Sequence, residues 1–298
     1  MSDFRLKVFR SVAKNLSFTK ASQELFVSQP AITKHIQELE AAYQTRLFDR
    51  QGSRISLTES GNLLLEHCER ILEDYKRLEY EMHLLHNEYT GGLKLGASTT
   101  IAQYVLPPLL ASFIGKFPQV SLSLLNGNSR EIEAALQEHR IDLGFVEGVF
   151  RLPNIRYTTF LEDELVAVVR TGSKLAGGEE ITPDELFHLP LVLRERGSGT
   201  LDVFERALQQ HNIKLSSLQV LMYLGSTESI KLFLEHTDCL GIVSVRSITR
   251  ELYSGQLRVV EIKGMPMLRD FSFAQPQGQE SGLAQVFMQF AMHNNHKL

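Results

Sequence analysis

Residues 17–61 constrain the fold most, because they contain the start signals and apolar spacings of two short helices separated by only a few residues. Ser28 can cap a helix whose first turn holds Pro30. A serine hydroxyl accepts from the unpaired N–H groups at a helix start, and proline has no N–H to leave unpaired. Apolar residues share one face of this helix and of each of the two helices expected before it: Phe9, Val12 and Ala13, then Phe18, Ala21 and Leu25, then Ile32, Ile36 and Leu39. Three short helices around one core are therefore expected, in a helix-turn-helix arrangement.

The opposite face of the third helix is polar. It carries Gln29, Thr33, Lys34 and Gln37. A helix that enters the major groove of DNA needs short donors and acceptors for base edges and a cation for phosphate or guanine. An ordinary solvated face is the alternative, and composition alone favours that alternative. The pattern of the surrounding residues favours contact with DNA.

Residues 47–58 alternate as two short strands on either side of Gly52. Arg50 and Arg54 flank the expected hairpin tip, where arginine suits a phosphate or a narrow minor groove. A hairpin that only adds solubility is the alternative. The pattern predicts a small basic wing beside the three helices.

The charges of the chain are segregated along its length. The net charge of −4 argues weakly against a nucleic-acid binder. However, residues 1–57 hold nine Lys/Arg against five Asp/Glu, while residues 58–89 hold three against eight. A DNA-binding head on an otherwise acidic protein would show this asymmetry. The positive excess is modest, so two heads in a dimer would bind DNA better than one.

Residues 64–85 have the heptad spacing of a dimerising helix. The apolar positions are separated alternately by four and three residues: Leu64, Cys68, Ile71, Tyr75, Leu78, Met82 and Leu85. A narrow apolar stripe on an acidic helix needs a partner, which predicts the seam of a homodimer. A core helix packed on the body of its own chain is the alternative. Thr90-Gly91-Gly92 is expected to end this helix.

The length of 298 residues predicts two or more domains. No apolar run reaches the ~18–20 residues of a membrane span, and the N-terminus lacks an apolar signal region. The two cysteines fit a reducing compartment, so we expect a cytoplasmic protein that does not enter a membrane. The spacing of Cys and His predicts no metal site and no cofactor.

Residues 91–298 alternate between strands and helices. Strands are expected at 93–97, 120–125, 142–146, 165–169, 191–194 and 241–245. Helices are expected at 101–117, 131–139, 203–212 and 229–236. Alternation of this kind predicts an α/β architecture with mostly parallel sheets.

Three loops in this region have the chemistry of an anion site. The three loops are Ser98-Thr99-Thr100, Gly197-Ser198-Gly199-Thr200 and Ser226-Thr227. Each follows a strand and begins a helix, where backbone N–H groups and hydroxyls can bind carboxylate, sulfate or phosphate. Each loop alone is a weak signal, because Ser and Thr cap most helices. Further candidates at two other strand ends are Asn126, Asn128, Ser129 and Glu147.

Known enzyme motifs do not fit this chain. The Gly197-Ser198-Gly199 run has Asp202 in place of the third glycine of a dinucleotide fingerprint, and it has no lysine for a phosphate-binding loop. Arg196 stands where a nucleophile elbow needs glycine. We therefore expect a protein that is not an enzyme.

The chain resembles the LysR-type transcriptional regulators over its full length. The most specific part of the resemblance lies in the winged head: Ser17-Phe18-Thr19, Ala21, Leu25, Ser28-Gln29-Pro30-Ala31, Leu39-Glu40, Leu47-Phe48-Asp49-Arg50 and Leu57-Thr58-Glu59-Ser60-Gly61. The resemblance implies a winged helix-turn-helix domain at 1–58, a dimerising linker helix at 59–90 and an effector-binding domain at 91–298. It also implies that this last domain is similar to a periplasmic binding protein, with lobe one at 91–163 plus 268–298 and lobe two at 164–267.

The family reads bases and phosphates from the start of its third helix, which implies contacts by Gln29, Pro30, Thr33 and Lys34, with Arg54 on the wing. Lys34 stands where arginine is common in the family, and a lysine lacks bidentate guanine recognition. Gln44 stands where the family usually ends this helix with glycine. The resemblance also implies tetramers on interrupted inverted repeats of double-stranded DNA. We expect effector binding to change the access of RNA polymerase to that DNA.

We therefore expect a transcriptional regulator whose DNA binding or bending responds to a small, anionic metabolite held between two lobes. Such a response requires that the ligand bind two conformations with different affinities. A solute-binding module without a DNA role and a cytoplasmic enzyme are the alternatives. The cationic head argues against the first, and the failed motifs argue against the second.

Overall fold

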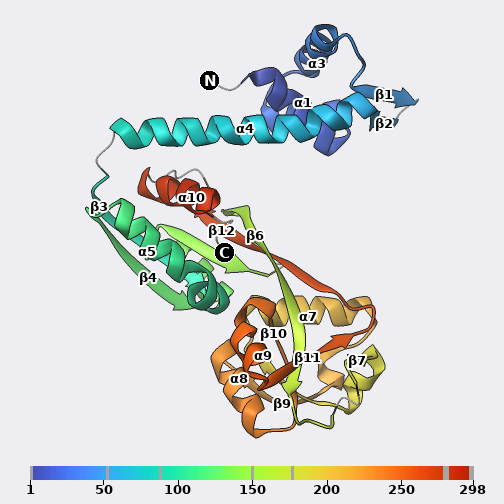
Figure 1. The fold of residues 1–298 in the computed structure, drawn as a ribbon, viewed down its shortest axis with the longest axis vertical. Coiled ribbons are helices and arrows are strands. Elements are labelled where there is room, and N and C mark those ends of the chain that lie inside the picture. The colour runs from blue at the N-terminus through green and yellow to red at the C-terminus, as the bar shows by residue number, and fades with distance from the viewer. Residues whose placement is uncertain are drawn as a thin grey trace. The chain divides into compact units, whose positions relative to one another are not determined.

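The computed structural model describes residues 3–51, 54–86, 89–148, 151–175, 178–277 and 282–294. The chain divides into two compact units, Met1–Glu88 and Tyr89–Leu298, here called the head and the body (Figure 1). Among the described residues, none of the helices combines the length and the apolar character that a membrane span requires.

The head contains the three predicted helices: α1 (Phe4–Asn15), α2 (Phe18–Leu25) and α3 (Gln29–Tyr43). The side chains predicted to face one another are buried in a single core, with Phe9, Ala21 and Ile32 fully enclosed. Asp3 caps α1 and Ser17 caps α2 by accepting backbone N–H groups through their side chains. The apolar spacing therefore predicted this core correctly.

The start of α3 differs from the expectation at Ser28. The helix begins at Gln29 with Pro30 in its first turn, as predicted, but the Ser28 side chain makes no capping hydrogen bond. The Ser28 backbone carbonyl accepts instead from the N–H of Ile32 at 3.2 Å. The predicted hydroxyl cap is therefore wrong, because the extended backbone of Ser28 and the fixed φ of Pro30 already start the helix.

Each of these three helices ends on a non-glycine residue in the left-handed conformation. The φ values are 44° at Leu16, 54° at Phe26 and 51° at Gln44. A side chain in this region places its Cβ close to the following carbonyl, which costs roughly 1 kcal/mol relative to glycine. Gln44, which stands where the family usually has glycine, therefore still adopts the left-handed turn that ends α3.

The wing follows as an antiparallel pair, β1 (Phe48–Gln51) and β2 (Arg54–Leu57), in the register Gln51↔Arg54. The long helix α4 (Glu59–His86) begins directly after it. Gly61 lets this helix approach the wing, since a Cβ at this position would lie 2.2 Å from the Leu47 carbonyl oxygen.

The first half of α4 is part of the head rather than a free linker. Cys68 and Leu72 are buried in the head core, and Leu64 packs against it. The Cys68 thiol donates to the Leu6 carbonyl oxygen at 3.3 Å. Leu64 and Cys68, which the heptad pattern assigned to the dimer seam, therefore pack within their own chain.

The body is built on one twisted sheet with the strand order β4-β3-β5-β12-β6-β10-β8-β9, and β7 and β11 pair beside it. The strands are β3 (Gly91–Ser98), β4 (Val120–Gly127), β5 (Leu143–Glu147), β6 (Ile155–Arg170), β7 (Glu180–Ile181), β8 (Pro190–Arg194), β9 (Gln219–Leu224), β10 (Leu240–Ser244), β11 (Leu257–Ile262) and β12 (Met267–Pro276).

The helical elements of the body are η1 (Ile101–Val105, a π-helix), α5 (Leu106–Lys116), α6 (Ser129–Gln137), η2 (Pro183–His188), α7 (Gly199–Gln210), η3 (Leu215–Ser217), α8 (Thr227–His236), η4 (Val245–Ser247), α9 (Thr249–Ser254) and α10 (Gly282–Asn294). The predicted single helix over 101–117 is therefore a π-helical turn followed by an α-helix.

The sheet has two parallel halves joined by antiparallel strands. In the half called the first lobe, β3 pairs in parallel with β4 and β5, and η1, α5, α6 and α10 pack around these strands. In the half called the second lobe, β8 pairs in parallel with β9 and β10, α7 and α8 pack on these strands, and α9 packs on β11. The prediction of mostly parallel sheets therefore holds within each lobe but not for the whole body.

The two lobes are joined by β6 and β12, which pair antiparallel from Met267↔Leu165 to Pro276↔Ile155 (Figure 1). The divisions at 163/164 and 267/268 implied by the family resemblance fall inside these two strands. Because both strands continue through both lobes, side chains near Asp163 and Arg269 stand where the lobes meet.

Candidate functional site

In the head, the polar face of α3 is accessible. Gln29, Pro30, Lys34 and Gln37 are exposed, while Thr33 is half-buried and its hydroxyl donates to the Gln29 carbonyl oxygen at 3.1 Å. The helix therefore presents two amide side chains and one cation together, which are the groups a base-reading helix uses. Arg50 and Arg54 belong to the paired strands of the wing, but their side chains lie outside the described part of the structure.

The apolar stripe on α4 remains exposed beyond the head core. Ile71, Leu78 and Met82 are 39%, 52% and 48% exposed, and Tyr75 is half-buried. The side chain of Leu85 lies outside the described residues. Large apolar side chains in a row on an acidic helix are unfavourable in water, which fits the predicted seam from Ile71 onward.

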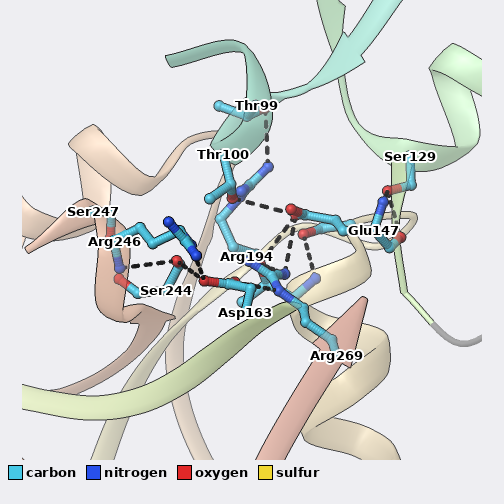
Figure 2. A network of polar contacts seen from close by, with 12 residues as sticks. Thr99, Thr100, Ser129, Glu147, Asp163, Arg194, Ser244, Arg246, Ser247 and Arg269 are labelled. Atoms are coloured by element: carbon cyan, nitrogen blue, oxygen red, sulfur yellow. Dashed lines mark hydrogen bonds and ion pairs between the residues drawn. The ribbon is translucent and has the colours of Figure 1, made fainter. Parts of the chain in front are cut away.

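In the body, a buried polar network lies where the lobes meet, centred on Glu147 at the end of β5 (Figure 2). Glu147 Oε1 accepts from the hydroxyl of Thr100 at 3.3 Å and from the hydroxyl of Thr200 at 3.4 Å. It also pairs with Arg269 Nη1 at 3.2 Å. Two of the loops predicted to bind an anion therefore converge, and in this structure the anion they hold is a carboxylate of the chain itself.

The arginine of this network is anchored by a second carboxylate. Arg269 Nε donates to Asp163 Oδ2 at 2.7 Å, and Arg269 Nη1 donates to the Thr200 hydroxyl at 3.0 Å. Asp163 also accepts from the Ser244 hydroxyl at 2.7 Å and lies 3.6 Å from Arg246 Nε. Each buried charge thus has an opposite charge beside it, as burial in a low-dielectric interior requires.

A second arginine, Arg194 at the end of β8, is 2% exposed. Its guanidinium donates to Glu195 at 2.8 Å from Nε, to the Thr99 hydroxyl at 3.3 Å and to the Gly225 carbonyl oxygen at 3.4 Å. Its Nη1 and the neighbouring loop's Ser98 Oγ are buried without a hydrogen-bond partner within the described residues. Buried polar groups without a hydrogen-bond partner are uncommon in folded proteins, which makes this part of the lobe boundary a candidate binding site.

The remaining predicted effector residues have structural roles in this conformation. Gly199 allows close packing, because an added Cβ would lie 2.2 Å from the Glu147 carbonyl oxygen. Ser198 caps α7, Asn128 caps α6 and Ser226 caps α8 through their side chains. Asn126 is exposed, Thr227 is buried and Ser129 donates its hydroxyl to the Glu147 carbonyl oxygen at 2.7 Å.

Sequence reasoning missed Asp163, Arg194 and Arg269. Each stands within or at the end of a run of strand residues, where a charged side chain is normally avoided. That signal was available in the sequence. Which of these charges would pair could not be read from it, since Asp163 and Arg269 are 106 residues apart.

A further polar cluster also crosses between the lobes. The Tyr104 hydroxyl of η1 donates to Glu228 of α8, and Lys231 pairs with Glu228 and Glu251 at 2.7 Å each. Burial raises the pKa of Tyr104 above its ordinary value, and the bond to Glu228 raises it further. Burial opposes ionisation of Glu228, but hydrogen bonds from Lys231 and Tyr104 outweigh it and hold the pKa of Glu228 below its ordinary value.

The comparisons with known proteins agree with this architecture. Residues 4–62 match the family described as bacterial regulatory helix-turn-helix protein, lysR family, and residues 86–295 match the LysR substrate binding domain. The chain is 35% identical over 258 residues to YeiE, an HTH-type transcriptional regulator of Escherichia coli (strain K12), covering 87% of this chain and 85% of YeiE.

Two solved structures are similar. The CcmR regulatory domain of Synechocystis PCC6803 in complex with 2-PG is 28% identical, covering 68% of this chain and 97% of that domain, with a TM-score of 0.62. Full-length CbnR complexed with its target DNA is 22% identical, covering 98% of this chain and 99% of CbnR, with a TM-score of 0.56.

Proposed function

This chain belongs to the LysR-type transcriptional regulators, which bind DNA and are not enzymes, and on that basis we propose that its effector is a small anion bound where the two lobes meet. The helix-turn-helix head makes the contact with DNA. The body is the effector-binding domain. We further propose that the polar face of α3 reads the bases, with Gln29, Pro30, Thr33, Lys34 and Gln37 in contact with DNA and Arg50 and Arg54 at the backbone.

The observation that carries the effector proposal is the pair of buried groups without acceptors, Arg194 Nη1 and Ser98 Oγ. The Thr99 hydroxyl accepts from Arg194, which connects the two groups through one loop. An oxygen-bearing anion supplies acceptors to both, and a charged hydrogen bond in a buried site contributes about 1.5–3 kcal/mol. A cation or an apolar ligand would leave the Arg194 Nη1 donor without an acceptor.

Two further observations support the proposal. The hydroxyls of Thr100 and Thr200 already bind a carboxylate, that of Glu147, so their positions suit an anion. CcmR, whose regulatory domain is similar to this body, was solved in complex with 2-PG. An effector that competes with Glu147 for these hydroxyls would bind two conformations with different affinities: one in which the hydroxyls bond to Glu147 and one in which they do not. A regulatory response requires such a difference.

We also propose that the chain acts as a homodimer, or as a homotetramer formed from such dimers, on an interrupted inverted repeat. The exposed stripe on α4 supplies the seam, and pairing doubles the cationic surface presented to DNA. The proposal places the protein in the cytoplasm with the DNA and RNA polymerase on which it acts.

The effector proposal is tested by thermal unfolding of the full chain against a panel of small inorganic and carboxylate anions, with matched cations and neutral hydrophobic compounds. An effector at about 100 times its Kd is expected to stabilise the fold by about 2.7 kcal/mol. Arg194→Lys should weaken that binding by at least tenfold, because lysine cannot reproduce the guanidinium geometry. Arg250→Lys, an exposed position on α9, is the control. Stabilisation by cations or neutral hydrophobes alone would refute the proposal.

A further inference from the structure

The starts of α2 and α3 lie side by side in the head, and a hydrogen bond joins two of their exposed side chains. The Thr19 hydroxyl of α2 donates to Gln29 Oε1 of α3 at 3.3 Å. Both residues are exposed. Gln29 is one of the residues proposed to contact bases, so Thr19 binds a group that the DNA would meet.

The Thr19 hydroxyl is held in place by the residues on either side of it. Phe18 is 6% exposed in the head core, with its ring centroid 5.9 Å from that of Phe48, and Ala21 is fully enclosed. The backbone of Thr19 is therefore fixed. Threonine is also branched at Cβ, which leaves its side chain few rotamers on a helix. The hydroxyl thus offers Gln29 a partner whose position changes little.

Gln29 is a long side chain at the first position of α3, directly before Pro30. The neighbouring Thr33 hydroxyl is used on the Gln29 backbone carbonyl oxygen at 3.1 Å, so it does not hold the amide. Within the described part of the chain, Thr19 is the only group that bonds to the Gln29 amide. Holding a flexible side chain before the DNA arrives lowers the entropy lost on binding.

The bond also determines which amide atoms remain for the DNA. A glutamine amide has one oxygen that accepts and one nitrogen that donates two hydrogen bonds. Here Oε1 is engaged by Thr19, while Nε2 donates to no group of the described chain. In the major groove, guanine alone presents two acceptors, O6 and N7. Adenine presents the acceptor N7 beside the donor N6, and pairing with both requires the glutamine oxygen.

We propose that Thr19 is a positioning residue for base recognition, which rests on the proposed contact of Gln29 with DNA. Thr19 engages Gln29 Oε1, so that Gln29 offers the groove its two Nε2 donors and selects guanine over adenine at one position of each half-site. Without the hydroxyl, Oε1 is free to accept from adenine N6, and Gln29 can form the bidentate pair with adenine.

The proposal is tested with the full chain by selection from a library of random duplex DNA, followed by fluorescence anisotropy on the selected duplex and its single-base variants. Gln29→Ala identifies the position that Gln29 reads, because the base preference there should disappear. The parent is expected to prefer guanine at this position.

Thr19→Val keeps the branched shape of threonine and removes the hydroxyl. It is expected to lower the ratio of guanine to adenine affinity at that position by at least about fivefold, with binding to random duplex within about twofold of the parent. Thr19→Ser, which retains a hydroxyl, should keep the ratio of the parent. Ser22→Ala is the control on the same helix, because its hydroxyl donates to the Thr19 backbone carbonyl oxygen at 2.8 Å, and it should also keep that ratio.

The double variant Thr19→Val/Gln29→Ala shows whether Thr19 acts through Gln29. Its base preference should equal that of Gln29→Ala alone, since without the amide the hydroxyl has nothing to hold. A further change of preference in the double variant would mean that Thr19 contacts a base itself and would overturn the proposal.

The remaining outcomes separate this inference from the proposed function. If Gln29→Ala alters no base preference, the proposed base contact fails and the inference fails with it. If Gln29→Ala removes a preference while Thr19→Val keeps the ratio of the parent, Gln29 reads the base without Thr19, and only the inference fails. An equal loss of affinity for all sequences in Thr19→Val, or a shift toward guanine, would also overturn it.

Discussion

At the scale of single residues, Gln44 shows how a position can depart from its ideal residue without altering the fold. It ends α3 with a φ of 51°, a region in which only glycine is free of a Cβ clash. The turn is held by the Gln44 N–H, which bonds to the Ala41 and Glu40 carbonyl oxygens, and these bonds use only the backbone.

Gln44→Gly is therefore expected to raise the stability of the head by roughly 0.5–1 kcal/mol, since removal of the Cβ strain exceeds the added flexibility of the unfolded chain. Ala41→Gly, at an exposed position within the same helix, should lower stability by about 1 kcal/mol. Thermal unfolding of both variants measures the difference. A destabilised Gln44→Gly would mean that the glutamine side chain contributes more than its backbone strain costs.

Lys34 is the single lysine on the exposed face of α3, and a lysine contacts phosphate as a point charge. Lys34→Ala should weaken binding to specific and random duplex DNA alike and reduce the slope of log K against log salt by about one phosphate contact. Lys214→Ala, exposed in the body, is the matched control. Fluorescence anisotropy over a salt series gives the slope, and an unchanged slope would remove Lys34 from the phosphate contacts.

At the scale of elements, α4 both completes the core of the head and exposes an apolar stripe, and the heptad pattern does not distinguish these two roles. Along the heptad stripe, Leu64 and Cys68 pack in the head core, while Ile71, Leu78 and Met82 are exposed; Leu72, outside the stripe, is also part of the core. The same spacing of four and three produces both, because a helix presents one stripe whether a neighbouring helix belongs to its own chain or to a partner.

Met82→Lys is expected to weaken the dimer by at least about 100-fold, because the variant places an unpaired charge in the apolar seam. Glu66→Lys, on the outer face of the same helix, should leave the dimer intact. Analytical ultracentrifugation over a range of concentrations distinguishes the two. A Met82→Lys variant that sediments as the parent does would show that the exposed stripe is not the seam.

At the scale of the whole molecule, several hydrogen bonds of the body cross between the two lobes. The backbone N–H of Arg130 donates to the Gly197 carbonyl oxygen at 3.2 Å, and the Thr200 hydroxyl reaches Glu147. The Tyr104 hydroxyl donates to Glu228 at a separate point of contact. The lobes are thus linked at several places along one boundary.

Tyr104→Phe removes one of these links and is expected to lower the stability of the body by about 1.5–3 kcal/mol, the usual contribution of a hydrogen bond to a charged group. Tyr253→Phe, at a residue 97% exposed, is the control. Chemical denaturation gives the free energy, and small-angle scattering reports whether the lobes separate. A variant as stable and as compact as the parent would show that this bond does not hold the lobes together.

The pKa of Glu228 gives that experiment a pH signature. Its folded pKa lies below its ordinary value of 4.5, so its contribution to stability is complete above about pH 4.5 and is lost as the pH falls through the lower folded pKa. In Tyr104→Phe, one of the two hydrogen bonds that lower this pKa is absent. The loss of stability on acidification attributable to Glu228 should therefore be smaller in the variant than in the parent.

The sequence by itself determined the elements whose signals are local. Spacings of three and four residues located α1, α2, α3 and α4. The alternation of strands with helices located β3, β4, β5, β8, β10, α6, α7 and α8 to within a few residues, but it gave no prediction for β7, β9, β11, β12, α9 and α10 and found only the second part of β6. It also located Thr100, Glu147 and Thr200 at the ends of strands or the starts of helices, because the end of an apolar run in the sequence marks the end of a strand. Ser226 caps its own helix, and the carbonyl of the adjacent Gly225 accepts from Arg194.

Only the tertiary structure decided which charges meet. Asp163 and Arg269 pair because β6 and β12 align them in register, and Arg194 of the second lobe reaches Thr99 of the first lobe across their boundary. Strand pairing across more than a hundred residues is set by the packing of whole lobes, and no local spacing encodes it.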